Sequence, residues 1–177
     1  CPVRRACDGY AGGIAEQLPY KEEKAARPTR RGVAFVALRD DGTVLLRTRP
    51  PKGLLGGMLE APSTPWEETA PTKTARAAHA PLDVPWQDVS GCVEHTFTHF
   101  HLELWVARAA VPEDVVLLDA AESERCRWLT MRELPGAALP TVMRKVLAHA
   151  FEAGPSKRFR PKTRASLVRR SEDRRSA

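Results

Sequence analysis

The sequence has no long apolar run. None of its 177 residues lies in a stretch that approaches the roughly 18 to 20 apolar residues of a membrane-spanning helix, and no charged segment precedes an apolar one as in a secretory signal. We therefore expect a cytoplasmic protein with no membrane partner. The hydrophobic content of 42% suffices for one domain of ordinary size with its own core, together with tails.

Cysteine is limited to four positions: Cys1, Cys7, Cys92 and Cys126. They would permit two disulfides, but nothing marks an oxidising compartment, so thiols or metal ligands are favoured. Cys92 and Cys126 lie in apolar, strand-like surroundings, which predicts core residues. Cys1 and Cys7 have C-x5-C spacing, which by itself is a weak signal and is compatible with two free thiols.

Acidic residues are few at both ends of the chain. Residues 1–52 carry 11 Lys and Arg against 6 Asp and Glu, residues 155–177 carry 9 against 2, and residues 53–154 carry 8 against 14. A basic end can bind a polyanion such as nucleic acid, but a charged tail is more often a solvated terminus without a partner. We predict a disordered basic tail over 155–177 and leave open whether it contacts DNA or another partner.

Proline and charge separate the ends of the chain from a compact body. Residues 14–30 are polar and broken by Pro19 and Pro28, which predicts an exposed connector between a cysteine-bearing segment, 1–13, and a domain over 31–154. Strand and helix patterns are mixed in that domain without a regular βαβ repeat. We therefore predict an α+β fold with a mixed sheet flanked by helices.

Local patterns place the main elements of the domain. Two β-rich runs surround Asp41 and Gly42, which indicates a hairpin because glycine supplies the positive φ that a tight turn needs. Apolar alternation within 91–111 predicts two strands that meet at a turn near residue 98. The other expected elements are a glycine-rich loop over 53–57, a modest helix within 68–82 and an amphipathic helix over 139–154.

A glycine-rich loop, a glutamate and a helix follow the hairpin, which is the order in which Nudix pyrophosphohydrolases begin their motif. That motif is G-x5-E-x7-R-E-U-x-E-E-x-G-U, where U is a bulky apolar residue, and its glutamates hold the magnesium that neutralises a diphosphate. Counted from Gly57, the first glutamate position holds Ser63, the Arg-Glu pair is Pro71-Thr72, and the helix reads ARAAHA. Hard cations need carboxylates, so the domain resembles a Nudix fold without its hydrolytic centre, which favours a binding module.

Three histidines, His95, His99 and His101, lie within seven residues. Zinc is one interpretation, but neither helical nor strand spacing puts all three on one face, so histidines that pack around a hairpin are favoured over a metal site. A further interpretation is that Phe97, Thr98 and His99 present a ring, a hydroxyl and an imidazole to a ligand at the strand junction.

Four segments carry a resemblance to a known family: ARPTRRGVAFVAL, KGLLGGMLEAP, HTFTHFHL and ALPTVMRKVLAHA. Through them the chain resembles the C-terminal part of the bacterial adenine DNA glycosylases of the MutY type. The resemblance spans residues 1 to about 154, and HTFTHFHL is its most specific part. It implies a Nudix-like domain that lacks hydrolase activity and recognises 8-oxoguanine opposite adenine in double-stranded DNA. It also implies a four-iron, four-sulfur cluster bound through C-x6-C-x2-C-x5-C, with Cys1 and Cys7 as the third and fourth ligands. Two thiolates cannot hold such a cluster, so we expect none in these 177 residues alone.

By this resemblance Phe97, Thr98 and His99 form the loop that probes the lesion, with Thr98 where serine is commoner. 8-Oxoguanine carries a proton on N7, where guanine has an acceptor, and a hydroxyl can accept a hydrogen bond from that proton. A hydrogen bond lost at a buried edge costs about 1 to 3 kcal/mol, so one side chain can separate the two bases by roughly ten- to hundredfold. His99 would hydrogen-bond the loop or a phosphate, and Phe97 would fix the turn by packing.

The resemblance implies contacts with the DNA backbone by Arg4 and Arg5, which lie between the two cysteines, and as a weaker candidate by Lys52. The whole protein would be a monomeric DNA N-glycosylase of the bacterial nucleoid, acting in base excision repair, with its helical catalytic domain missing from this chain.

Two alternative functions stay open. One is a Nudix-type nucleotide pyrophosphohydrolase, acting for example on 8-oxo-dGTP, and the other is a noncatalytic basic adaptor that binds nucleic acid regardless of the lesion.

Overall fold

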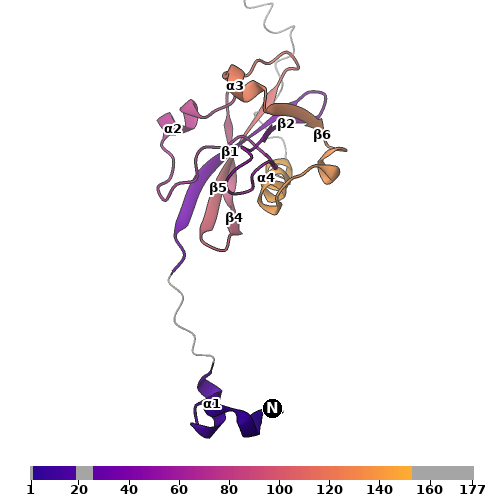
Figure 1. Ribbon diagram of the computed structural model, residues 1–177. Coiled ribbons are helices and arrows are strands. Elements are labelled where there is room, and N and C mark those ends of the chain that lie inside the picture. The colour runs from indigo at the N-terminus through magenta and orange to yellow at the C-terminus, as the bar shows by residue number, and fades with distance from the viewer. Residues whose placement is uncertain (1, 19–25, 153–177) are drawn as a thin grey trace, which may run out of the picture.

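The computed structural model describes residues 2–18 and 26–152 (Figure 1). The predicted connector therefore lies partly outside the described residues, and the basic tail over 155–177 lies wholly outside them. No helix in the described residues is long and apolar enough to cross a membrane. The first segment contains three short helical turns: η1 (Arg4–Ala6), α1 (Asp8–Ala11) and η2 (Ala15–Gln17).

The second segment is a mixed sheet with few helices, and the predicted α+β class is confirmed. Its strands are β1 (Thr29–Arg39), β2 (Thr43–Thr48), β3 (Leu59–Glu60), β4 (Gln87–Thr96), β5 (His101–Val111) and β6 (Cys126–Thr130). Its helices are α2 (Lys73–Ala78), α3 (Ala120–Ser123), the 3-10 turn η3 (Leu134–Gly136) and α4 (Thr141–Glu152).

The strand order is β3-β2-β1-β5-β4, and β6 pairs with β2. β1 and β5 run parallel along their whole length, while the other pairs are antiparallel. The β4–β5 hairpin therefore joins the sheet through the pairing of β5 with β1, and its turn projects at one end of the sheet (Figure 1).

Helix α4 packs on one face of the sheet and closes the larger core (Figure 1). Its amphipathic pattern predicts that Val142, Val146, Leu147 and Ala150 face the sheet, and all four are buried, as is Met143. Alternate residues of β1 and β5 point toward α4, and their neighbours point to the opposite face. There Trp86 packs edge-on against Phe35, with ring centroids 5.0 Å apart.

The edge of β1 opposite β5 is shared by two partners. β2 pairs with β1 only near the hairpin, at Leu38↔Val44, and the segment 62–67 takes over toward the start of β1. The backbone N–H of Val33 donates to Thr64 Oγ1 at 3.0 Å, and the N–H of Thr64 donates back to the Val33 carbonyl at 3.0 Å. This pairing places Trp66 over Gly32, where a Cβ would lie 2.9 Å from Cδ1 of Trp66.

The predicted hairpin at Asp41 and Gly42 is confirmed. Gly42 has φ 81°, and Thr43 donates to Asp41 Oδ1 from its backbone N–H at 2.8 Å and from its hydroxyl at 2.7 Å. These two hydrogen bonds lower the pKa of the Asp41 carboxyl. The predicted helix within 68–82 is also present but shorter, because Thr72 caps α2 by accepting from the Ala75 N–H at 3.2 Å.

The prediction that Cys92 and Cys126 are core residues is wrong, because both are only half-buried. Cys92 lies on β4, the edge strand, directly after a register shift at Gly91, whose φ is 86°. Cys126 begins β6, which pairs with β2 only, and it packs at the margin of the smaller core. Partial burial still raises the pKa of both thiols.

Candidate functional site

The turn of the β4–β5 hairpin, residues 97–100, holds the predicted recognition residues. The backbone N–H of Phe97 donates to the Phe100 carbonyl at 2.9 Å and closes the turn. Phe100 is buried and Phe97 half-buried, whereas Thr98 and His99 are exposed at the tip. The strand junction therefore exposes the hydroxyl of Thr98 and the imidazole of His99, whereas the ring of Phe97, which we expected to be presented with them, is half-buried.

Phe97 packs against three other rings, which explains how so short a turn is held in place. The centroid of its ring lies 4.7 Å from that of His95, 4.8 Å from that of Phe100 and 6.1 Å from that of Trp66, on which it stacks. Burial and the nearby Lys145 ammonium lower the pKa of His95, which favours a neutral imidazole in this cluster. Phe97 thus positions the turn, while Thr98 and His99 remain accessible.

A pocket of about 400 Å³ opens beside this aromatic cluster. Its lining includes Arg30, Arg47, Arg49, Arg125, Glu60 and Trp66. Leu54 of the glycine-rich loop and Pro50, which precedes that loop, form part of its wall. That loop needs a glycine at position 56, because a Cβ there would lie 2.5 Å from the Pro51 carbonyl oxygen.

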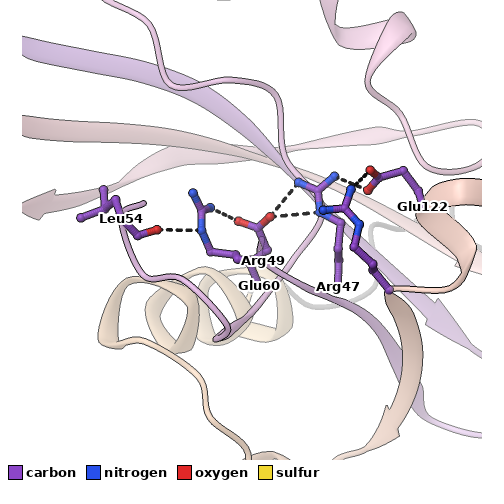
Figure 2. Close-up of polar contacts among 6 residues, drawn as sticks. Arg47, Arg49, Leu54, Glu60 and Glu122 are labelled. Atoms are coloured by element: carbon purple, nitrogen blue, oxygen red, sulfur yellow. Dashed lines mark hydrogen bonds and ion pairs between the residues drawn. The ribbon is translucent and has the colours of Figure 1, made fainter. Parts of the chain in front are cut away.

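Glu60 anchors the arginines of this pocket (Figure 2). Its side chain is 2% exposed, and Arg47 donates to Glu60 Oε1 from Nε at 3.0 Å and from Nη2 at 2.7 Å. Arg49 donates to the other oxygen, Oε2, and its Nε donates to the Leu54 carbonyl at 3.0 Å. One buried carboxylate thus fixes two guanidinium groups and ties the glycine-rich loop to them.

A second carboxylate, that of Glu122, also binds Arg47. Glu122 accepts from Arg47 Nη1 at 2.9 Å and also pairs with Arg125, as Figure 2 shows for Arg47 and Glu122. Three arginines, Arg47, Arg49 and Arg125, therefore share two carboxylates around the pocket. Arg30 has no ion pair among the described residues, and its guanidinium lies 4.6 Å above the ring of Phe100.

The pocket and the 97–100 turn share side chains. The ring of Trp66 stacks on that of Phe97, and its centroid lies 5.0 Å from the Arg49 guanidinium. Arg30 reaches from the pocket to Phe100 beneath the turn. Trp66 and Arg30 therefore join the turn and the pocket into one continuous surface.

The described residues offer no site for a hard cation. They contain no group of three or more His, Cys, Asp or Glu side chains able to hold a metal ion. Ser63, at the position of the first Nudix glutamate, is buried in the pocket wall. The three histidines likewise form no such group. His95 packs against the ring of Phe97, His99 is exposed at the turn, and Nδ1 of His101 is hydrogen-bonded to the Thr96 hydroxyl at 2.9 Å.

The predicted site residues near the start of the chain are two arginines, Arg4 and Arg5, and two cysteines, Cys1 and Cys7. Arg4 lies over the ring of Tyr10 at 4.1 Å, and Arg5 is exposed. Cys7 is a free, half-buried thiol next to α1, while Cys1 lies outside the described residues. An iron–sulfur cluster needs four ligands, and the described segment 2–18 supplies a single thiol, so these residues alone do not fit such a group.

Lys52, the weaker candidate, is exposed beside the glycine-rich loop but does not line the pocket. Arg30, Trp66 and the group of Arg47, Arg49 and Glu60 were not predicted as site residues. One signal was available: Arg47 and Arg49 are two residues apart at the end of a strand, a spacing that places both on the same face.

Comparison with known proteins identifies the domain. A family model for the NUDIX domain matches residues 33–149. Human adenine DNA glycosylase is 32% identical to the chain over 135 residues, which are 70% of this chain and 24% of that protein. The chain therefore spans about a quarter of the length of that relative.

Two solved structures show the same fold. The C-terminal domain of mouse MUTYH, solved in complex with human PCNA, is 25% identical, with a TM-score of 0.54 over 72% of this chain and 90% of that one. The MutT protein from Methanosarcina mazei Go1 is 19% identical, with a TM-score of 0.53 over 73% of this chain and 98% of that one, and supports the fold alone. The chain belongs to the Nudix-domain family.

Proposed function

We propose that the chain is the DNA-contacting, lesion-recognising part of an adenine DNA glycosylase. The whole protein would remove adenine paired with 8-oxoguanine or guanine in base excision repair. The observation that carries this proposal is the 97–100 turn, which exposes Thr98 and His99 above a packed aromatic base. Similarity to human adenine DNA glycosylase and to the mouse MUTYH C-terminal domain supports it.

The chemistry of the turn suits a damaged purine. The Thr98 hydroxyl can accept from the N7 proton of 8-oxoguanine, whereas unmodified guanine offers only an acceptor at N7. His99 would donate to a neighbouring phosphate oxygen, a contact that positions the strand without reading its sequence. Because Phe97 is fixed by three rings, the hydroxyl is held at the tip at little further entropic cost.

The pocket argues against the nucleotide pyrophosphohydrolase alternative. Such an enzyme must hold magnesium with carboxylates, and the acidic side chain that lines this pocket, Glu60, already binds Arg47 and Arg49. Its oxygens are therefore occupied by guanidinium groups. A binding role for the domain agrees better with that arrangement than metal-assisted hydrolysis.

Binding of the 177-residue chain to two duplexes tests the proposal. The duplexes are identical except that one has an 8-oxoguanine:adenine pair and the other a guanine:adenine pair. We expect tighter binding of the lesion duplex, no release of free adenine by this chain, and no magnesium-dependent release of pyrophosphate from 8-oxo-dGTP. Equal binding of both duplexes would favour a noncatalytic basic adaptor, and pyrophosphate release would favour the hydrolase.

A further inference from the structure

We propose that the arginine-lined pocket is a phosphate-binding site that holds a backbone phosphate of the DNA strand whose base contacts the 97–100 turn. This inference rests on the proposed function and adds a second contact surface to it. The bound chemistry would be a phosphodiester held by guanidinium groups, without a metal ion.

The first argument is an excess of positive charge around an open pocket. Arg30, Arg47, Arg49 and Arg125 line the pocket, and only Glu60 and Glu122 pair with any of them among the described residues. Four positive charges against two negative ones leave two charges without a counterion. An anion that enters the pocket would therefore be attracted by a local field that water screens only in part.

The second argument is that the donors are already arranged and partly unused. Glu60 holds Arg47 and Arg49 in fixed positions, so binding would not have to order these two long side chains. Among the described residues, Arg49 Nη2 makes no hydrogen bond, and neither does the guanidinium group of Arg30. Guanidinium groups of this kind match the oxygens of a phosphate as planar, paired donors.

The third argument identifies the source of the phosphate. Arg30 lies against Phe100 and Trp66 stacks on Phe97, so the pocket is continuous with the turn that carries Thr98. A polynucleotide strand can place a base at the turn and a phosphate of the same strand in the pocket. A free nucleotide or pyrophosphate would occupy the pocket without that link, and this difference can be measured.

The test is the salt dependence of binding between the 177-residue chain and the 8-oxoguanine:adenine duplex. Each phosphate contact contributes about 0.9 to the slope of log K against log salt concentration. Arg30→Ala should therefore reduce the slope by about 0.9, and Arg30→Lys, which keeps the charge, should largely retain it. The matched control is Arg132→Ala, which removes an exposed charge that does not line the pocket and should leave the slope unchanged.

Several outcomes would overturn the inference. These are an unchanged slope in Arg30→Ala, an equal reduction in Arg132→Ala, or duplex binding too weak to measure at about 50 mM salt. Inorganic pyrophosphate that binds through Arg30 while the duplex slope stays unchanged would assign the pocket to a free phosphate compound instead. Thermal melts of each variant check that the domain stays folded.

The same data separate this inference from the proposed function. Loss of a phosphate contact should weaken binding of both duplexes equally and leave the preference for 8-oxoguanine intact. A wild-type chain without that preference, whose slope still falls in Arg30→Ala, would retain the phosphate site and refute lesion recognition. A preference that persists with an unchanged slope would refute the phosphate site alone.

Discussion

Glu60→Gln should destabilise the domain by about 2 to 3 kcal/mol. Removal of one partner from a buried ion pair typically costs 3 to 5 kcal/mol, because the opposite charge stays buried without compensation. Here the cost should be about 2 to 3 kcal/mol, since the side chains of Arg47 and Arg49 are 21% and 20% exposed and Arg47 keeps its bond to Glu122. Glutamine preserves the shape of the side chain, so the loss reports the charge and its hydrogen bonds rather than a cavity.

Urea and thermal unfolding of the 177-residue chain measure this loss. For a protein of this size, each kcal/mol lowers the melting temperature by about 2 to 4 °C, so a decrease of about 5 to 10 °C is expected. Glu103→Gln is the matched control, because Glu103 pairs with Arg31 at 2.9 Å but both side chains are more exposed, at 26% and 36%. That control should lose less than about 1 kcal/mol. Equal losses in the two variants would refute the idea that Glu60 anchors the pocket.

The remaining predictions concern the support of the 97–100 turn. Gly32→Ala should cost about 1 to 3 kcal/mol, because the new carbon would lie 2.9 Å from Trp66 Cδ1 and 3.1 Å from Leu104 Cδ2. Gly136→Ala, with nothing within 4 Å, is its control, and equal melting temperatures would contradict the packing of Trp66. His95 has a lowered pKa, so the unfolded chain binds the proton more readily and stability should fall as the pH drops below about 6.5. His95→Gln should make the free energy of unfolding fall less steeply between about pH 7 and 5.5, and an unchanged slope would count against a neutral His95.

Much of the fold follows from local patterns in the sequence. Asp41 and Gly42 specify a tight turn, and the alternation of Leu102, Leu104 and Val106 specifies the buried face of β5. The exposed tip at Thr98 follows from the same hairpin. These features depend on residues close to one another in the chain, where backbone geometry and side-chain period act directly.

The pocket could not be derived in this way. Glu60 meets Arg47 across the β2–β3 pairing and Glu122 meets it from α3, so the group depends on contacts between distant segments. The half-buried state of Cys92 likewise depends on β4 being an edge strand, which the apolar run around it does not reveal. Local pattern identifies a strand, but its neighbours decide which side chains it buries.

The most direct test of lesion recognition is the preference ratio of three proteins: wild type, Thr98→Ala and Thr98→Ser. The quantity measured is the dissociation constant for the guanine:adenine duplex divided by that for the 8-oxoguanine:adenine duplex, at one fixed salt concentration. Thr98→Ser keeps the hydroxyl and should keep the ratio, whereas Thr98→Ala should lower it about fivefold to tenfold, the equivalent of a lost hydrogen bond of about 1 to 1.4 kcal/mol. A Thr98→Ala variant with the wild-type ratio would contradict the assignment of Thr98 as the residue that reads 8-oxoguanine.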